Sequence, residues 1–269
     1  MYLADYHIHS TCSPDGHYTM SRMAEAAVER GLDGICFTDH LDTVEWGTYA
    51  PRTTFDWAEA ARQVREAREK WGDRLTIRLG AELGEAAMSF DRAETLLAGA
   101  PELDFVIGSV HMMGKRHGYE DLYYIPKADA AFYHDVIDDY LDDVMAVARW
   151  GRFQVLGHLT LPVRYIWDNA GIKMDFSAHM DAVEEIFREI IPRGIGIECN
   201  TNRGASPMPD ESILRLYRRL GGEIITIGSD AHSPDYVGCR VEETQELLRQ
   251  CGFRFISTFT GGKPEFQPL

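Results

Sequence analysis

Two histidines near the amino terminus, His7 and His9, have the spacing and the chemistry of a metal-binding pair. Residues at i and i+2 of a strand project from the same face, so both imidazoles can reach one metal ion. The same pair also fits a strand that simply carries two half-buried histidines. A metal site would therefore require further ligands from later segments of the chain.

The composition is that of a globular chain with a strong negative charge. The chain has 269 residues, of which 45% are hydrophobic and 26% charged, and its formal net charge is −16. This charge disfavours binding to long nucleic acids or anionic membranes, but it permits a small phosphorylated ligand bound through divalent metals. No apolar run approaches the roughly 18 residues of a membrane span, and Met1–Asp5 does not resemble a signal peptide, so we expect a cytoplasmic protein.

The five cysteines indicate reduced thiols rather than a disulfide framework. Their number is odd, and no two of them form a Cys-x-x-Cys pair. We therefore expect no disulfide among Cys12, Cys36, Cys199, Cys239 and Cys251.

Strand patterns alternate with helical patterns along the whole chain. This alternation predicts a parallel sheet, and seven or eight strand-helix units without a linker favour one closed barrel, residues 1–269, over an open doubly wound sheet. No Gly-x-Gly-x-x-Gly follows any strand to support the open sheet. We expect strands at 5–9, 34–38, 75–81, 104–110, 153–156, 194–198 and 223–227, a last strand at 253–259, and helices at 19–30, 55–71, 91–97, 129–150, 177–191, 210–220 and 241–251.

Each of the seven expected barrel strands ends in polar residues, and a barrel of this type places its chemistry at those ends. Six of the ten histidines fall there, whereas His17, His117, His134 and His179 lie in loops and helices. Burying so many titratable groups without partners would cost several kcal/mol each, and metal coordination is the usual compensation. We expect a site for several metal ions built from His7, His9, His40, His111, His158 and His232 with carboxylates such as Glu82 and Asp230.

The strand ends also carry short sequence motifs, which are His7-x-His9, Asp15, Phe37-Thr38-Asp39-His40, Glu82, Ser109-Val110-His111, Gly157-His158 and Gly228-Ser229-Asp230-Ala231-His232. This set resembles the PHP (polymerase and histidinol phosphatase) superfamily from residue 5 to about 240, and all nine ligand positions are filled. The resemblance implies a single-domain, distorted (β/α)7 barrel of the TIM type with up to three divalent metals, Zn, Mn or Fe. It also implies one metal at His7, His9, Glu82 and Asp230, a second at Glu82, His111 and His158, and a third at Asp15, His40 and His232.

The chemistry implied by such a site is hydrolysis of a phosphomonoester. Two metals would share a water, lower its pKa and direct the resulting hydroxide at phosphorus, so that no protein nucleophile is required. The chain has no Cys-x5-Arg motif, and no lysine at the end of strand three or four that would suit an amidohydrolase. The residues expected to act in catalysis are Asp15, Glu82, Asp230 and His232.

Two arginines, Arg164 and Arg203, follow strands five and six in loops from which they could hold phosphate oxygens. Both resemble the arginine-bearing loops of the histidinol-phosphatase branch, which implies histidinol phosphate as substrate and a role in histidine biosynthesis. Histidinol phosphate carries a cationic amine, which would suit Asp42, Glu45 and Trp46. The simpler interpretation is that these three are solvated loop residues. The alternatives are a nucleotide, short oligonucleotide or other small phosphoester, and a non-catalytic metal-binding or regulatory protein.

Overall fold

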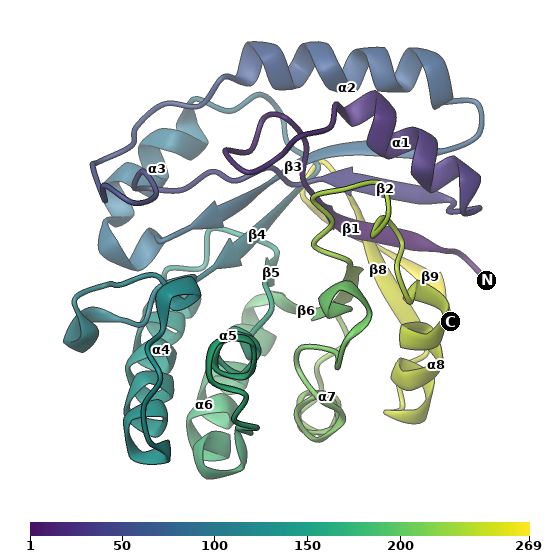
Figure 1. The fold of residues 1–269 in the computed structure, drawn as a ribbon. Coiled ribbons are helices and arrows are strands. Elements are labelled where there is room, and N and C mark those ends of the chain that lie inside the picture. Colours follow the sequence, from purple (N-terminus) through teal and green to yellow (C-terminus); the bar gives the residue numbers. More distant parts are fainter.

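A ring of parallel strands forms the centre of the computed structural model, which describes residues 1–269. Seven strands follow one another in chain order, and helices surround them (Figure 1). Beyond β7, a bridge between Ile8 and Ala231 joins the chain to the end of β1 and nearly closes the ring. The expected barrel is therefore confirmed over the open sheet. The strands are β1 (Ala4–Ile8), β2 (Gly34–Phe37), β3 (Thr76–Gly84), β4 (Phe105–Ser109), β5 (Val155–Leu156), β6 (Gly196–Asn200) and β7 (Ile225–Gly228).

Local sequence signals set the helix boundaries. The side chains of Thr19, Asp56 and Asp129 accept hydrogen bonds from backbone N–H groups in the first turn of α1, α2 and α4. Gly151 ends α4 with a φ of 66°, a left-handed conformation that glycine adopts without strain. The helices are α1 (Met20–Glu29), α2 (Trp57–Trp71), α3 (Phe90–Ala98), α4 (Ala130–Trp150), α5 (Leu161–Ala170), α6 (Met180–Ile190), α7 (Glu211–Arg219) and α8 (Val241–Gln250).

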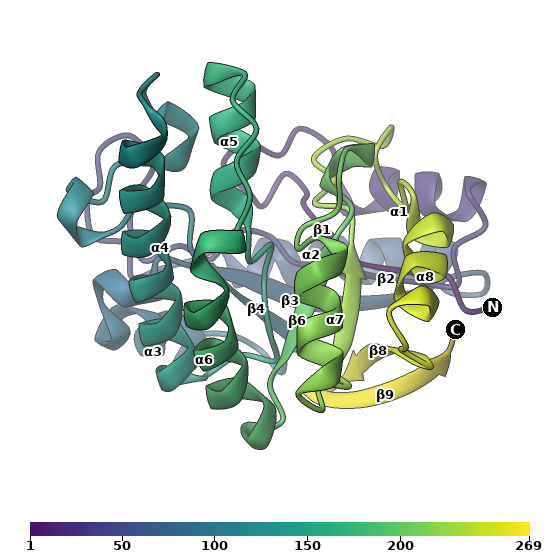
Figure 2. The ribbon, with the colours of Figure 1, turned by 90° about the horizontal axis from the view of Figure 1, so that it is seen from below.

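Two apolar layers fix the helices on the ring. One layer joins α1 and α2 to β2 and β3 through residues such as Met23 and Ile77. The larger layer includes Val136, Phe187 and Leu214 of α4, α6 and α7, which lie along one side of the molecule (Figure 2). No helix combines the length and the apolar character that crossing a membrane requires. All five cysteines are free, as expected.

The helix α5 is absent from the sequence prediction, which has a loop at residues 158–164. Pro162 lies in the first turn of α5. Proline is well tolerated there, because the first N–H groups of a helix have no partner within it. Arg164 is therefore held on a helix and not on a loop. Strand β3 is also longer than expected and contains Glu82 in its interior.

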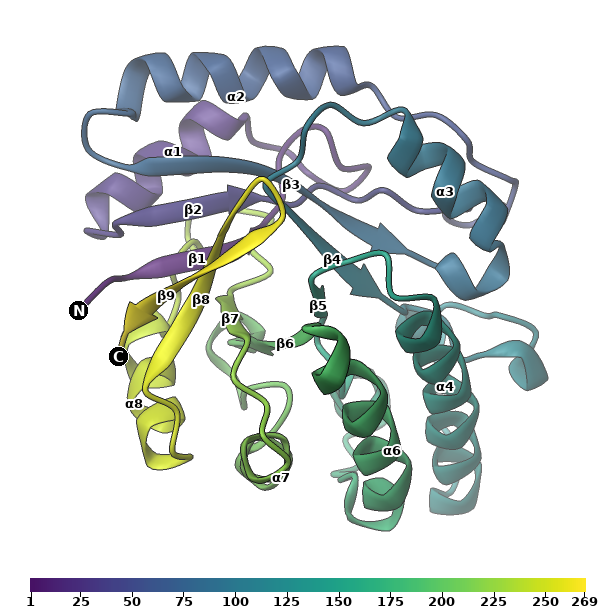
Figure 3. The ribbon, with the colours of Figure 1, turned by 180° about the vertical axis from the view of Figure 1, so that it is seen from behind.

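The expected last strand, 253–259, does not belong to the barrel. Strand β8 (Phe255–Thr260) pairs antiparallel with β9 (Lys263–Pro268), a strand that the sequence did not predict. The ring of Phe259 lies 4.8 Å from that of Phe105, and its N–H donates to the Tyr6 hydroxyl at 3.2 Å. Figure 3 shows this hairpin in front of β1 and β7. It covers the barrel and does not extend it.

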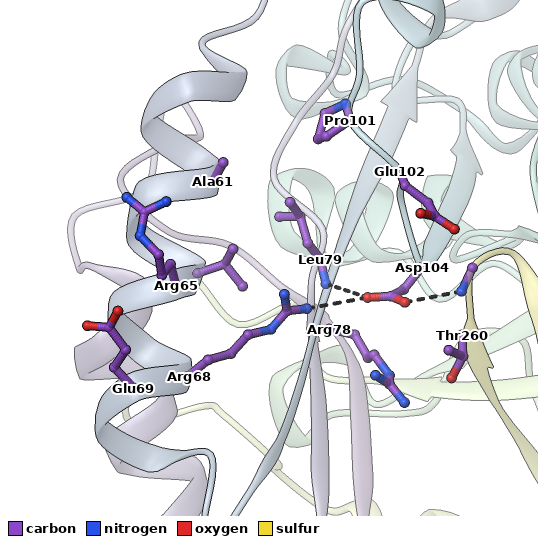
Figure 4. A pocket seen from close by; sticks show the side chains of 12 residues that line it. Ala61, Arg65, Arg68, Glu69, Arg78, Leu79, Pro101, Glu102, Asp104 and Thr260 are labelled. Carbon is purple, nitrogen blue, oxygen red and sulfur yellow. Dashed lines mark hydrogen bonds and ion pairs between the residues drawn. The ribbon is translucent and has the colours of Figure 1, made fainter.

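A polar connection joins α2, β3 and the β8–β9 turn near the amino end of β4. Arg68 donates to the Ile77 carbonyl at 2.9 Å and lies 3.5 Å from the Asp104 carboxylate. The Asp104 carboxylate also accepts the N–H groups of Leu79, at 3.2 Å, and of Gly261, at 3.1 Å (Figure 4). These bonds hold the hairpin turn and the helix on the same end of the barrel, beside a hollow of about 820 Å³.

Candidate metal centre

The carboxylate of Glu82 lies at the centre of the expected ligands. Its side chain is 1% exposed, and Oε1 accepts a hydrogen bond from the Ser109 hydroxyl at 2.7 Å. The same oxygen lies 2.8 Å from His158 Nε2 and 3.2 Å from His111 Nε2. Strands β3, β4 and the end of β5 therefore deliver one carboxylate and two imidazoles to a single point.

The other oxygen of Glu82 belongs to a second group of donor atoms. The Nε2 atoms of His7 and His9 lie 3.3 and 3.5 Å from Glu82 Oε2, and 3.8 and 3.4 Å from Asp230 Oδ1. In a tetrahedral zinc site with bonds of about 2.0–2.1 Å, neighbouring ligand atoms are about 3.3–3.4 Å apart. These separations fit four donors around one cation.

Several of these buried atoms have no hydrogen-bond partner. They include Nε2 of His7, Nε2 of His9 and Oε2 of Glu82. A buried polar atom without a partner is costly, and proteins leave few of them. Because the donors approach one another without hydrogen-bond geometry, the residues fit a bound cation better than a network of direct hydrogen bonds.

A third group lies beside the first two. His232 Nε2 is 2.8 Å from Asp15 Oδ2, and His40 Nε2 is 4.0 Å from Asp15 Oδ1. Ring nitrogens of His9, His40 and His232 lie within 4.8 Å of one another, and His40 Nδ1 is 3.1 Å from Glu82 Oε2. The structure thus brings all nine expected ligands into one cluster. Their division among three metals stays a prediction.

Two glutamates that the sequence analysis did not assign orient the histidines. Glu198 contacts His7 Nδ1 at 2.7 Å and accepts the backbone N–H of His158 at 2.8 Å, while Glu85 contacts His111 Nδ1 at 2.8 Å. Such contacts fix the ring orientation and the tautomer of metal-binding histidines. Glu198 lies at the end of the strand expected at 194–198, inside the observed β6, and so matches the pattern that identified the expected ligands, whereas Glu85 lies beyond the strand expected at 75–81.

Left-handed backbone conformations occur at three residues of the site. Asp230, Glu85 and Arg203 have φ angles of 57°, 60° and 50°. This conformation is costly for residues other than glycine and persists only where the surrounding structure enforces it. The Asp230 N–H, for example, donates to the His7 carbonyl at 2.9 Å. The backbone is therefore held in the shape that directs these side chains.

The cluster keeps its carboxylates ionised. Burial alone would raise the pKa of Glu82, but the neighbouring imidazoles, first His7, hold that pKa well below its usual value. Burial would likewise raise the pKa of Asp230, but its close contact with His9, at 3.4 Å, and the charges of His7 and His232 lower that pKa strongly. Both carboxylates are thus in the form that binds a cation.

The pKa values of the imidazoles diverge. Burial alone would lower the pKa of His40, but the charges of Glu82 and Asp42 raise it to about 9 in the metal-free cluster. Burial lowers the pKa of His9 well below its usual value, and the charge of His232 adds to this effect. The metal-free cluster therefore holds both protonated and neutral imidazoles.

The donor cluster opens into a pocket of about 600 Å³, which both expected arginines line. Arg164 Nη1 lies 3.4 Å from Asp230 Oδ2, and Arg164 Nε lies 4.0 Å from Asp168 Oδ2. Arg203 reaches the pocket from the turn after β6, where the Asn202 N–H donates to Asn200 Oδ1 at 2.8 Å. The structure thus places both arginines beside the cluster, as the sequence analysis expected.

Of the three residues considered for a substrate amine, only Trp46 lines this pocket. Its ring lies 4.6 Å from that of His40. Asp42 is fully buried, so it is neither a solvated loop residue nor a wall of the pocket, and Glu45 does not line it either. The acidic side chains that do line the pocket, besides those of the donor cluster, are Asp121 and Asp168.

Comparison with known proteins agrees with this geometry. The family model of the PHP domain matches residues 5–202. The chain belongs to the PHP domain family. Within it, a histidinol-phosphatase of Lactococcus lactis subsp. lactis is 27% identical over 266 residues, which cover 96% of this chain and 95% of the relative. A probable histidinol-phosphatase of Thermotoga maritima is 28% identical over 258 residues, 95% of each chain.

A solved structure confirms the fold of this PHP domain. The Lactococcus lactis histidinol phosphate phosphatase, complexed with Zn, L-histidinol and phosphate, has a TM-score of 0.82 to the chain at 24% identity and covers 98% of both chains. The distorted barrel expected from the sequence is thus the observed one. The family and the clustered donors together identify the PHP domain as a metal-dependent phosphoesterase.

Proposed function

We propose that this PHP domain hydrolyses L-histidinol phosphate to L-histidinol and phosphate, a step of histidine biosynthesis. The proposed substrate rests mainly on a pocket that is lined by the donor cluster, two arginines and two further aspartates. Histidinol phosphate has the matching distribution of charge, with an anionic phosphate at one end and a cationic amine at the other. The names of the two relatives and the ligands of the solved neighbour support the same substrate.

The proposed cofactors are up to three divalent cations, Zn, Mn or Fe. His-rich sites with carboxylates suit all three metals. When bound, the metals would lower the pKa of a water to make it nucleophilic and would neutralise charge on the phosphoryl oxygens. The donor residues would be His7, His9, Glu82 and Asp230 for one metal, Glu82, His111 and His158 for the second, and Asp15, His40 and His232 for the third.

The pocket walls would hold the two ends of the substrate. Arg164 and Arg203 would bind phosphate oxygens, because a guanidinium presents several donors in a plane that matches them. Asp121 and Asp168 would face the amine, replacing the Asp42 and Glu45 of the sequence prediction. The volume of the pocket, about 600 Å³, is within the range of sites for small ligands.

The test is a comparison of kcat/KM for histidinol phosphate, nucleotides and sugar phosphates with Zn or Mn added to the purified protein. We expect a clear preference for histidinol phosphate. Asp121→Asn should reduce this preference and leave the hydrolysis of glycerol phosphate, which has no amine, unchanged. Equal kcat/KM values for all the esters would contradict the proposed substrate but not the phosphatase chemistry.

A nucleotide or another small phosphoester is the second candidate substrate, and the same assay would identify it. The observation that favours it is a groove beside the pocket, into which a longer ester could extend. The negative charge of the chain disfavours a long nucleic acid. A purely metal-binding role would require turnover to be absent for every ester, although each of the nine donor positions is filled.

A further inference from the structure

A second hollow, of about 740 Å³, adjoins the candidate active-site pocket. We call it the distal groove and define it by Trp167, Lys173, Met174, Phe176 and Met208, none of which lines the active-site pocket. Phe176 and Met208 are 2% and 1% exposed and form its floor, whereas Trp167 is 58% exposed on its rim. So large an exposed aromatic beside an apolar floor is typical of a surface that binds a ligand.

The distal groove is continuous with the active-site pocket. Arg164, Asp168 and Arg203 line both hollows. Arg164 contacts Asp230 of the donor cluster at 3.4 Å, so the groove begins one side chain away from the cluster. A phosphomonoester whose phosphate lies at the cluster could therefore extend its leaving group past the two arginines.

The charges of the groove indicate what such a leaving group would carry. Two of its acidic residues are engaged locally, since Asp175 accepts the Ser177 N–H at 2.9 Å and Asp210 accepts the Ser212 N–H at 2.9 Å. The ion pairs of the structure include neither Lys173 nor Arg203, which both line the groove. Because Arg203 would bind the phosphate, Lys173 is the cation left for the far end of the groove, and a cation beside apolar walls fits an apolar or aromatic body that ends in an anionic group.

We propose that the distal groove binds the far end of the leaving group of a larger phosphomonoester, one with an aromatic body and a second anionic group. The proposal rests on the phosphatase function proposed above. It extends the substrate range, because the amine of histidinol phosphate would use only the active-site pocket. Trp167 would stack on the aromatic body, and Lys173 would pair with the terminal anion.

The test uses three esters that share an aryl leaving group and differ in length and charge: phenyl phosphate, biphenyl-4-yl phosphate and 4′-carboxybiphenyl-4-yl phosphate. We expect kcat/KM of the metal-loaded protein to rise about tenfold or more from the first to the third, since the second ring would be buried. Trp167→Ala should remove most of the gain for both biphenyl esters. Lys173→Met should remove only the part that depends on the carboxylate.

The controls distinguish binding in the distal groove from hydrolysis at the donor cluster. Both variants should hydrolyse phenyl phosphate and histidinol phosphate as the unmodified protein does, and Phe266→Ala, a matched change of an aromatic that is 47% exposed on β9, should alter none of the values. Turnover of phenyl phosphate without any gain for the larger esters, or a gain that survives both variants, would overturn the distal groove alone. Failure to hydrolyse any of the four esters would overturn the proposed function and the groove with it.

Discussion

Carboxylates shielded from solvent occur at both ends of the barrel, half-buried Asp104 at the amino end and buried Glu82 at the carboxyl end, but their surroundings differ. At the amino end, Asp104 accepts two backbone N–H groups and lies near Arg68, so the protein itself supplies its partners. At the carboxyl end, Glu82 faces five imidazoles, and its Oε2 has no hydrogen-bond partner. The difference separates a structural carboxylate from one whose contacts fit a bound cation.

The comparison also explains why residue type alone does not identify a site. Asp104 and Asp230 are the same amino acid, and each lies next to a barrel strand. Asp104 joins segments of the backbone, whereas Asp230 is held in a left-handed conformation that presents its side chain to His7 and His9. The neighbours that the fold provides, not the carboxylate, decide which chemistry is possible.

The largest expected effect is the removal of a ligand at the carboxyl end. Asp230→Ala and His9→Ala should each lose bound metal and at least about 1,000-fold in phosphatase activity, because the metals contribute several kcal/mol to catalysis. Elemental analysis and steady-state kinetics measure the two losses, and circular dichroism checks that the variants fold. Full turnover by metal-free protein would show that the cluster is not the active centre.

A smaller loss of metal affinity or activity should follow when a residue that orients the expected ligands is changed. Glu198→Gln keeps the size of the side chain but removes the charge that faces His7, so metal affinity or activity should fall about 10- to 100-fold. Metal titration and kcat/KM measure this effect. The matched control is Glu265→Gln on the exposed strand β9, which should change neither quantity. If the two variants behaved identically, Glu198 would have no role in metal binding or activity.

The carboxylate at the amino end should affect stability and not activity. Asp104→Ala leaves the N–H groups of Leu79 and Gly261 without their partner, and we expect the free energy of unfolding to fall by about 1–3 kcal/mol. Denaturant unfolding gives this value, and kcat/KM at a temperature where the variant is folded should be unchanged. A loss of metal from this variant would contradict a purely structural role of Asp104.

Metal binding at the carboxyl end should release protons. In the metal-free cluster the pKa of His40 is raised to about 9, and the pKa values of His7 and His111 are raised well above their usual range, in each case by carboxylates that outweigh burial. His40 is therefore protonated at pH 7.5, and a metal must displace its proton.

We expect zinc binding at pH 7.5 to release at least about one proton, and its affinity to rise with pH until His40 has lost its own proton near pH 9. Calorimetry in two buffers with different ionisation enthalpies measures the release. Asp104→Ala should release as many protons as the unmodified protein. A binding heat that does not depend on the buffer would contradict the charge state described for the cluster.

The barrel and the placement of the expected ligands at strand ends could be predicted because both depend on local patterns. Alternating strand and helix signals indicate the parallel ring, and polar residues such as His111 and His158 follow strands directly. Two elements could not be predicted in this way. Helix α5 was missed because it contains Pro162, although proline is tolerated in the first turn of a helix. Strand β9 was missed because its sequence is polar and contains two prolines, which an edge strand tolerates.

The sequence by itself determined which residue types stand at the ends of the strands, because strand periodicity and chain order depend only on neighbouring residues. Tertiary structure decided which atoms meet. Only the nearly closed ring places Glu82 among five histidines, puts Glu198 behind His7, and holds Arg164 between the pocket and the distal groove. These distances join segments far apart in the chain, and they are set by side-chain packing that no local pattern encodes.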